Sequence, residues 1–262
     1  MTDISMRAPG LVERDFRVGR VFNRAASVLS RNFVPFVAIA AVAALPNLWR
    51  TTAIGGSAAV AARGAHNPYA PVLTVFGLVM LGLISFGISQ AAILNAAYQD
   101  MSGRPSPIGE SLRKGLRRFL PIIGLAILQG LGIFIASVFL LFPGFIVMAM
   151  WFVSLPACVV ERLGPIGSLG RSRALTKGHR WKIFGIVVLL TIVNFIGIGV
   201  IMALIGISPM RPVGYPLVYG VATWIWGSLI GAFQATVAVV SYYELRAAKE
   251  GIDIEQIVAV FD

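Results

Sequence analysis

Residues 168–190 read SLGRSRALTKGHRWKIFGIVVLL, with five cations before residue 183 and an unbroken apolar run after it. Cations placed immediately before an apolar run of about 20 residues are typical of a helical membrane protein. The stretch therefore raises two questions: how many such runs the chain contains, and what its clustered cations do.

The composition indicates a membrane protein. The chain has 262 residues, of which 57% are hydrophobic and 13% charged, whereas soluble domains carry about 25% charge. Four long runs contain no charged residue and a fifth is shorter: residues 72–98, 119–160, 183–210 and 212–243, and residues 33–49. We expect an all-α, polytopic helical membrane protein.

The run 119–160 is too long to cross a bilayer once. Its 42 residues would extend roughly 63 Å as one helix, about twice the hydrocarbon thickness. Pro143 and Gly144 favour a turn near its middle, which brings the total to six spans. The second half, residues 145–160, is short and carries Pro156, so we expect it to be little tilted or partly re-entrant.

The distribution of cations predicts the orientation. All but three of the 22 Lys and Arg residues lie before residue 33, in the connections 99–118 and 161–182, or after residue 243; the exceptions are Arg50, Arg63 and Arg211. The positive-inside rule then places both termini in the cytoplasm. We expect the protein in the inner (cytoplasmic) membrane of the cell. The net charge of +11 is explained by this bias and by attraction to anionic lipid, so we expect no nucleic-acid partner.

A repeated unit organises this single membrane domain, 1–262. A cation followed by an aromatic residue precedes apolar sequence at Arg31–Phe33, Arg118–Phe119 and Arg180–Trp181. We expect three pseudo-equivalent units, each an amphipathic elbow helix followed by two spans. The segments are 1–32 with the first elbow, 33–98 with spans one and two, 104–160, 161–243, and the cytoplasmic tail 244–262.

The elbow helices are predicted to lie in the membrane surface. In the first, Val18, Val21, Phe22, Ala25, Val28 and Leu29 share one face, which we expect in the acyl boundary with cations toward phosphates. Pro165 is the predicted first residue of the third elbow. The candidate headgroup ligands are Arg17, Arg20, Arg24, Arg31, Arg113, Lys114, Arg117, Arg171, Arg173, Lys177, Arg180 and Lys182. Ordinary juxtamembrane connectors without a lipid role are the alternative.

The spans lack ionised groups. Their polar residues are amides and hydroxyls, which interhelical hydrogen bonding explains; alternatively Gln90, Gln129, Asn194 and Gln234 line a polar cavity. Only His66 and His179 are present, on opposite predicted sides, and there is no phosphate loop or paired carboxylate motif. We therefore expect a non-enzymatic protein without a metal or cofactor site.

Two further patterns concern packing and partners. The motif Gly227–Gly231 and the small-residue pairs at 132–136 and 199–203 allow close helix approach, which we expect within the monomer. In the tail, Ile254, Ile257, Val258 and Phe261 share one helical stripe. The segment 252–262 docks under the elbows or binds a protein partner.

The runs 168–181 (SLGRSRALTKGHRW), 242–246 (YYELR) and 249–251 (KEG) resemble six-span bacterial inner-membrane proteins of uncharacterised function. They are also similar to the membrane portion attached to some glycerophosphodiester phosphodiesterases. The chain lacks the phosphodiesterase domain itself, so the resemblance implies the membrane architecture and no catalytic residue.

Three functions remain open at this point. The first is a protein that organises or senses the anionic cytoplasmic leaflet, with anionic phospholipids as its partners. The second is a transporter or permease-like component for a lipid or other amphipathic solute. The third is a membrane subunit that binds a protein partner through its tail.

Overall fold

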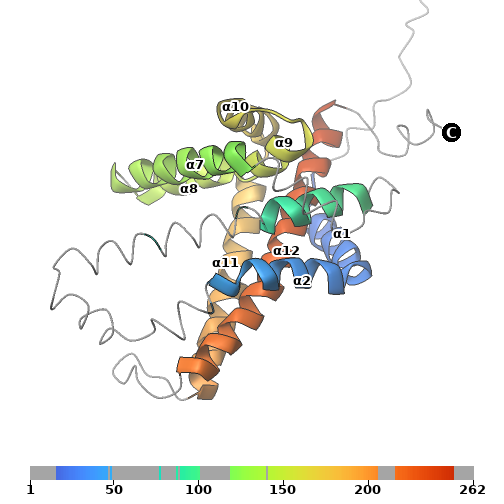
Figure 1. Ribbon diagram of the computed structural model, residues 1–262. Coiled ribbons are helices and arrows are strands. Elements are labelled where there is room, and N and C mark those ends of the chain that lie inside the picture. Colours follow the sequence, from blue (N-terminus) through green and yellow to red (C-terminus); the bar gives the residue numbers. More distant parts are fainter. Residues whose placement is uncertain are drawn as a thin grey trace, which may run out of the picture.

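The computed structural model describes residues 16–46, 48, 77, 87, 89–100, 119–139, 141–205 and 216–250. These residues are helical almost throughout and include no strand, which confirms the predicted all-α class (Figure 1). The helices are α1 (Val18–Arg31), α2 (Phe33–Ala43), α7 (Phe119–Phe139), α8 (Leu141–Met150), α9 (Ser154–Val160), α10 (Pro165–Thr176), α11 (Arg180–Ile205) and α12 (Pro216–Glu250). Residues 89–100 are helical as well.

Two of the described helices are long and apolar enough to cross a membrane, namely α11 and the part of α12 from Leu217. The bent pair α1 and α2 would supply a third crossing if it forms one span. α11 and α12 lie side by side and antiparallel (Figure 1). The Trp226 indole Nε1 donates a hydrogen bond to the Asn194 side-chain oxygen at 3.3 Å and joins them.

The described residues leave the apolar surface of α11 largely uncovered. Only 11% of its most apolar 18-residue window is buried. The exposed side chains are Leu189, Ile192, Val193, Phe195, Ile196, Val200 and Leu204. A helix that is apolar on all sides and not covered by protein is suited to hydrocarbon rather than water, so the chain is membrane-associated.

The run 119–160 folds back, as its length predicts. α7 and α8 lie side by side (Figure 1), and the Gln129 amide donates to the Trp151 carbonyl at 3.3 Å across the pair. α7 ends at Phe139 and α8 begins at Leu141, slightly before the predicted turn, and Pro143 falls in the first turn of α8. A proline is tolerated there because that N–H has no intrahelical acceptor. Both helices run across the direction of α11 and α12 (Figure 1).

A break separates α8 from α9, and Pro156 explains it. Proline has no N–H and its ring clashes with the carbonyl four residues earlier, so the helix cannot continue through residues 151–153. The Ser154 N–H bonds to the Trp151 carbonyl at 3.1 Å instead of to Met150. The freed Met150 carbonyl accepts hydrogen bonds from the Ser172 and Thr176 hydroxyls of α10, at 2.8 and 3.2 Å. The break therefore creates the contact that attaches α10 to α8.

α1 meets α2 at an angle of 88°. Pro35 lies in the first turn of α2, where its ring excludes a straight continuation from α1. The Asn32 side chain donates a hydrogen bond to the Val28 carbonyl at 3.2 Å. This bond provides a donor for a carbonyl in the last turn of α1.

Candidate functional site

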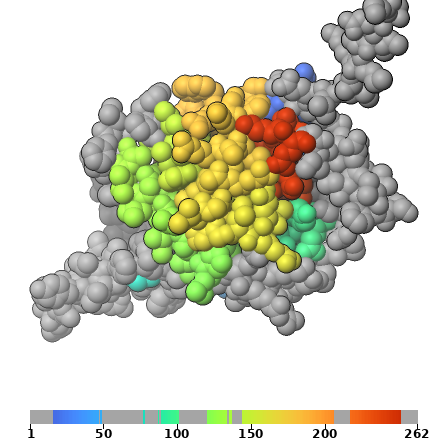
Figure 2. All heavy atoms as spheres, turned by 90° about the horizontal axis from the view of Figure 1, so that it is seen from above, coloured from blue at the N-terminus to red at the C-terminus, as the bar shows by residue number. Residues whose placement is uncertain are grey.

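Charged side chains gather where α11 begins and α12 ends. At 35 residues, α12 is about 52 Å long, well beyond the ~30 Å hydrocarbon core. Its last turns, Glu244–Glu250, contain four charged residues and project past the apolar part. Seen from this end, residues of α9 and α10 (yellow) occupy the centre, between α7 and α8 (green) and the end of α12 (red) (Figure 2).

Glu244 attaches α1 to α12. Its carboxylate is only 7% exposed and receives hydrogen bonds from Arg20 and Arg24 at 3.3 and 3.2 Å. On the adjoining face, Val21 and Ala25 of α1 are fully buried, and Phe22 packs against Phe233 of α12.

The sequence predicts that the apolar face of α1 lies in the acyl boundary. This prediction is wrong for Val21, Phe22 and Ala25, because α12 covers them. An interface with lipid and an interface with another helix would bury the same apolar stripe of α1. The helical pattern therefore predicts that this face is buried, but it does not identify what covers the face.

Arg171 joins three elements at the same end. Its guanidinium binds the Glu161 carboxylate of the α9 end at 2.7 and 2.9 Å and the Glu250 carboxylate of α12. Burial disfavours the charge of Arg171, but its hydrogen bonds to both carboxylates and their negative charges outweigh burial and raise its pKa. The Tyr242 hydroxyl donates to Glu161 at 2.5 Å. Together these contacts hold α9, α10 and α12 in one charged network.

The other predicted headgroup ligands fall into three groups. Arg31 pairs with Asp100 at 3.1 Å, and Lys182 donates to the Phe16 carbonyl at 2.9 Å. Arg17, Arg173, Lys177 and Arg180 form no ion pair within the described residues. Arg113, Lys114 and Arg117 lie outside the described residues, as does the segment 252–262. Arg17, Arg173, Lys177 and Arg180 are therefore available to an outside anion.

α10 departs in one respect from the predicted elbow. It begins at Pro165, as expected, but its buried residues are mainly hydroxyl-bearing: Ser168, Ser172, Thr176 and also Leu175. Ile166 is 78% exposed. A stripe of small hydroxyl residues permits close approach and satisfies the carbonyls freed by the α8–α9 break, so this face binds protein rather than lipid.

The four amides predicted to line a polar cavity have separate environments. The Gln90 side chain donates to the Gly231 carbonyl at 3.1 Å, while Gln129 bonds to Trp151 and Ser154. Asn194 accepts from Trp226. No hydrogen bond joins any two of the four amides, Gln234 included, all of which lie in the described part of the chain. Interhelical bonding accounts for Gln90, Gln129 and Asn194.

Glu161 and Glu244 are the acceptors that organise this end, and their role was not predicted from the sequence. Each directly follows a long apolar run, 119–160 or 212–243. Their signal is nevertheless present, because a carboxylate at the end of an apolar helix, among excess cations, is a probable ion-pair acceptor at low dielectric. Tyr242 gives no comparable signal, since its direct neighbours in sequence, Ser241 and Tyr243, carry no charge.

We expect Glu250→Gln to lower stability at neutral pH but not in acid. Burial opposes the charge of Glu250, but hydrogen bonds from Arg246 and Arg171 hold its pKa below the ordinary value of 4.5. Stability from a depressed carboxylate pKa is complete above the unfolded pKa and is lost as the pH falls through the folded pKa. The difference from wild type in SDS-induced unfolding should be at most about 1 kcal/mol at pH 7 and should disappear in acid. A difference that stays constant down to about pH 3 contradicts this account.

Comparison with known proteins identifies a family but no activity. Residues 108–245 match the family described as a domain of unknown function (DUF7847). The chain matches no curated protein and no solved structure.

Proposed function

Because the chain belongs to the DUF7847 family, whose function is unknown, we propose a function from its physical features. The protein is a non-enzymatic integral protein of the inner membrane that binds and organises anionic lipid of the cytoplasmic leaflet. The observation that carries the proposal is the junction of α10 and α11. There Arg173, Lys177 and Arg180, which have no ion pair within the described residues, lie before or at the first residue of α11, whose apolar surface the described residues leave largely uncovered.

The electrostatics support lipid as the partner. Each cation near an anionic leaflet contributes about 1 kcal/mol of attraction. At the same end Arg20, Arg24 and Arg171 already have carboxylate partners. The unpaired cations have no carboxylate partner among the described residues, and lipid phosphates are counter-ions that a membrane supplies.

The proposed topology has six spans and cytoplasmic termini. The 88° angle between α1 and α2 supports an elbow helix followed by a span, and the cation-rich end supports the orientation. In this topology α7 and α8 are the third and fourth spans; because they run across the direction of α11 and α12 (Figure 1), the alternative is a re-entrant hairpin, which leaves four spans. Both arrangements place residues 113 and 162 on one side.

Cysteine labelling from one side of the membrane tests this topology. On a Cys158→Ser background, Arg113→Cys and Arg211→Cys should label from opposite sides, and labelling from the same side would refute it. Leu141→Cys, next to the reversal, should label from outside if α7 and α8 span the membrane and should not if they are re-entrant.

The lipid function predicts a measurable preference. In nanodiscs containing phosphatidylglycerol and phosphatidylcholine, spin-labelled phosphatidylglycerol should be enriched at the surface of the full-length protein. Removing Lys177 and Arg173 together (both to Gln) should weaken the preference by about 1 kcal/mol per cation.

The matched control is Arg31→Gln combined with Asp100→Asn, which removes a cation together with its acid partner. This pair should leave the preference unchanged. Equal preference for both lipids in the wild type would reject the proposed function. The resemblance to phosphodiesterase membrane portions stays a prediction, and no hydrolytic activity is proposed.

A further inference from the structure

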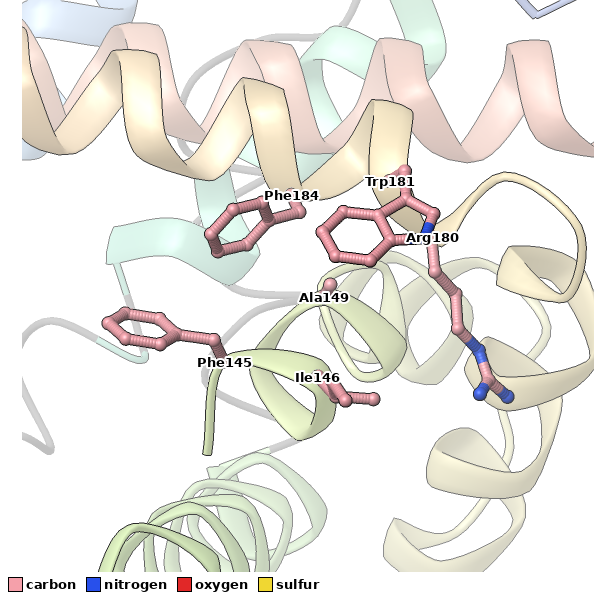
Figure 3. A pocket seen from close by; sticks show the side chains of 6 residues that line it. All are labelled: Phe145, Ile146, Ala149, Arg180, Trp181 and Phe184. Carbon is pink, nitrogen blue, oxygen red and sulfur yellow. The ribbon is translucent and has the colours of Figure 1, made fainter. Parts of the chain in front are cut away.

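A small cavity lies between α8 and the first turns of α11. Phe145, Ile146 and Ala149 line it from α8, and Arg180, Trp181 and Phe184 line it from α11 (Figure 3). Its volume is about 210 Å³, smaller than a typical pocket for a whole organic ligand. The space suits a segment of an extended apolar chain.

The walls of the cavity are aromatic and uncovered. The Phe184 ring meets the Phe145 ring at 5.7 Å and the Trp181 ring at 6.0 Å, both edge to face. Trp181 is nevertheless 73% exposed and Ile146 40%. Tryptophan is enriched at the level where headgroups meet acyl chains, which is where α11 changes from charged to apolar sequence.

Arg180 forms the polar edge of the cavity. Its guanidinium extends away from the aromatic rings, past the start of α11 (Figure 3). Its Nε is buried and has no hydrogen-bond partner, and Arg180 has no ion pair within the described residues. A buried donor without a partner is unfavourable, so an acceptor at this position would stabilise the site.

Two further cations lie near Arg180 without an acid between them. Lys249, in the last turn of α12 and beyond its apolar part, donates to the Ala174 carbonyl at 2.8 Å. Burial, and then the charges of Lys177 and Arg180, lower the pKa of Lys249. The three cations therefore repel one another and have no counter-ion among the described residues, whereas Arg171 and Arg246 nearby share Glu250.

We propose that this cavity and its cations bind one molecule of an anionic phospholipid, with its phosphate at Arg180 and Lys177 and part of one acyl chain among Phe145, Ile146 and Phe184. An anionic lipid fits better than a zwitterionic one, because a headgroup ammonium would add a fourth cation. A phospholipid fits better than free phosphate, because the aromatic walls offer phosphate nothing. This inference rests on the proposed membrane function and assigns it a discrete site.

Lipid titration of the full-length protein in detergent tests the site. Native mass spectrometry counts bound phosphatidylglycerol for wild type, Arg180→Gln and Arg162→Gln. Arg162 is exposed, does not line the cavity and has no acidic partner in the described residues, so its substitution makes the same change in net charge. We expect one tightly bound phosphatidylglycerol, at least about tenfold weaker binding in Arg180→Gln, and less than a twofold change in Arg162→Gln.

A further variant and two competing ligands distinguish a phospholipid site from a phosphate site and from no discrete site. Phe184→Ala should weaken phosphatidylglycerol binding and leave inorganic phosphate without effect as a competitor at millimolar concentration. Displacement of the lipid by inorganic phosphate would overturn the lipid assignment, as would equal binding of phosphatidylcholine. Equal binding by wild type and Arg180→Gln would overturn the site. If the nanodisc preference for phosphatidylglycerol persists in that case, only the discrete site fails; if the preference is absent, the proposed function itself fails.

Discussion

Glu244→Gln should lower the free energy of unfolding by about 2 kcal/mol and release α1 from α12. The substitution leaves Arg20 and Arg24 facing an amide, whose NH₂ group cannot accept their hydrogen bonds. Hydrogen bonds to a charged group contribute about 1.5–3 kcal/mol each. Both arginine side chains are about 40% exposed, so water recovers part of that loss. SDS-induced unfolding in mixed micelles measures the loss in free energy of unfolding. Faster amide hydrogen exchange along α1, above all at Val21, would show that the loss comes from release of this helix.

Asp100→Asn is the matched control for Glu244. It also removes a carboxylate that pairs with a cation of α1, but Arg31 is 61% exposed, and exposed pairs contribute about 0–1 kcal/mol. The control should therefore change stability and α1 exchange little. Similar losses in the two variants would show that burial of Glu244 does not strengthen its contacts.

Gly197→Ala should lower the free energy of unfolding by about 1–3 kcal/mol. A Cβ at this position would lie 2.1 Å and 2.2 Å from two carbons of the Trp226 indole, closer than van der Waals contact allows. The indole must move, which breaks its hydrogen bond to Asn194 and separates α11 from α12. SDS-induced unfolding measures the loss, and the tryptophan emission spectrum should change with it.

Gly199→Ala provides the comparison within the same helix. A Cβ there meets nothing within 4 Å, and alanine has the higher helix propensity by about 1 kcal/mol. This variant should be neutral or slightly stabilised. If both substitutions have the same effect, the cost arises from the backbone and not from contact with Trp226.

The helical class and the reversal of the run 119–160 could be predicted from local sequence. The helices that pack against one another could not. Run length alone required 119–160 to reverse, and Pro165 marked the start of α10. The motif Gly227–Gly231 was the clearest candidate for close packing, yet Gly227 has open space around it and Gly231 meets only the Gln90 amide at ordinary distance. The tightest contacts fall at Gly132 of the predicted pair 132–136, which meets Trp151, and at Gly197, which belongs to no predicted motif. Such pairings depend on how helices far apart in sequence meet, which no local pattern encodes.

The charged site shows the same division. Positive-inside counting identified the cations, because it depends on sequence position only. Counting could not tell which cations have a carboxylate partner. Glu244 pairs with Arg20 and Arg24, while Lys177 and Arg180 have no ion pair within the described residues. This difference depends on where α12 places its acids. Spacing likewise predicted that one face of α1 is buried, but not that α12 covers it.

Neutral hydroxyl contacts and charged contacts hold opposite sides of α10, and they differ in their response to ionic strength. Dissolved ions screen the bonds from Arg171 to Glu250 at the exposed edge, while the bonds from Ser172 and Thr176 to the Met150 carbonyl carry no net charge to screen. Concentrated electrolyte should thus loosen α10 from the end of α12 and leave it fastened to α8, so that the helix pivots without detaching.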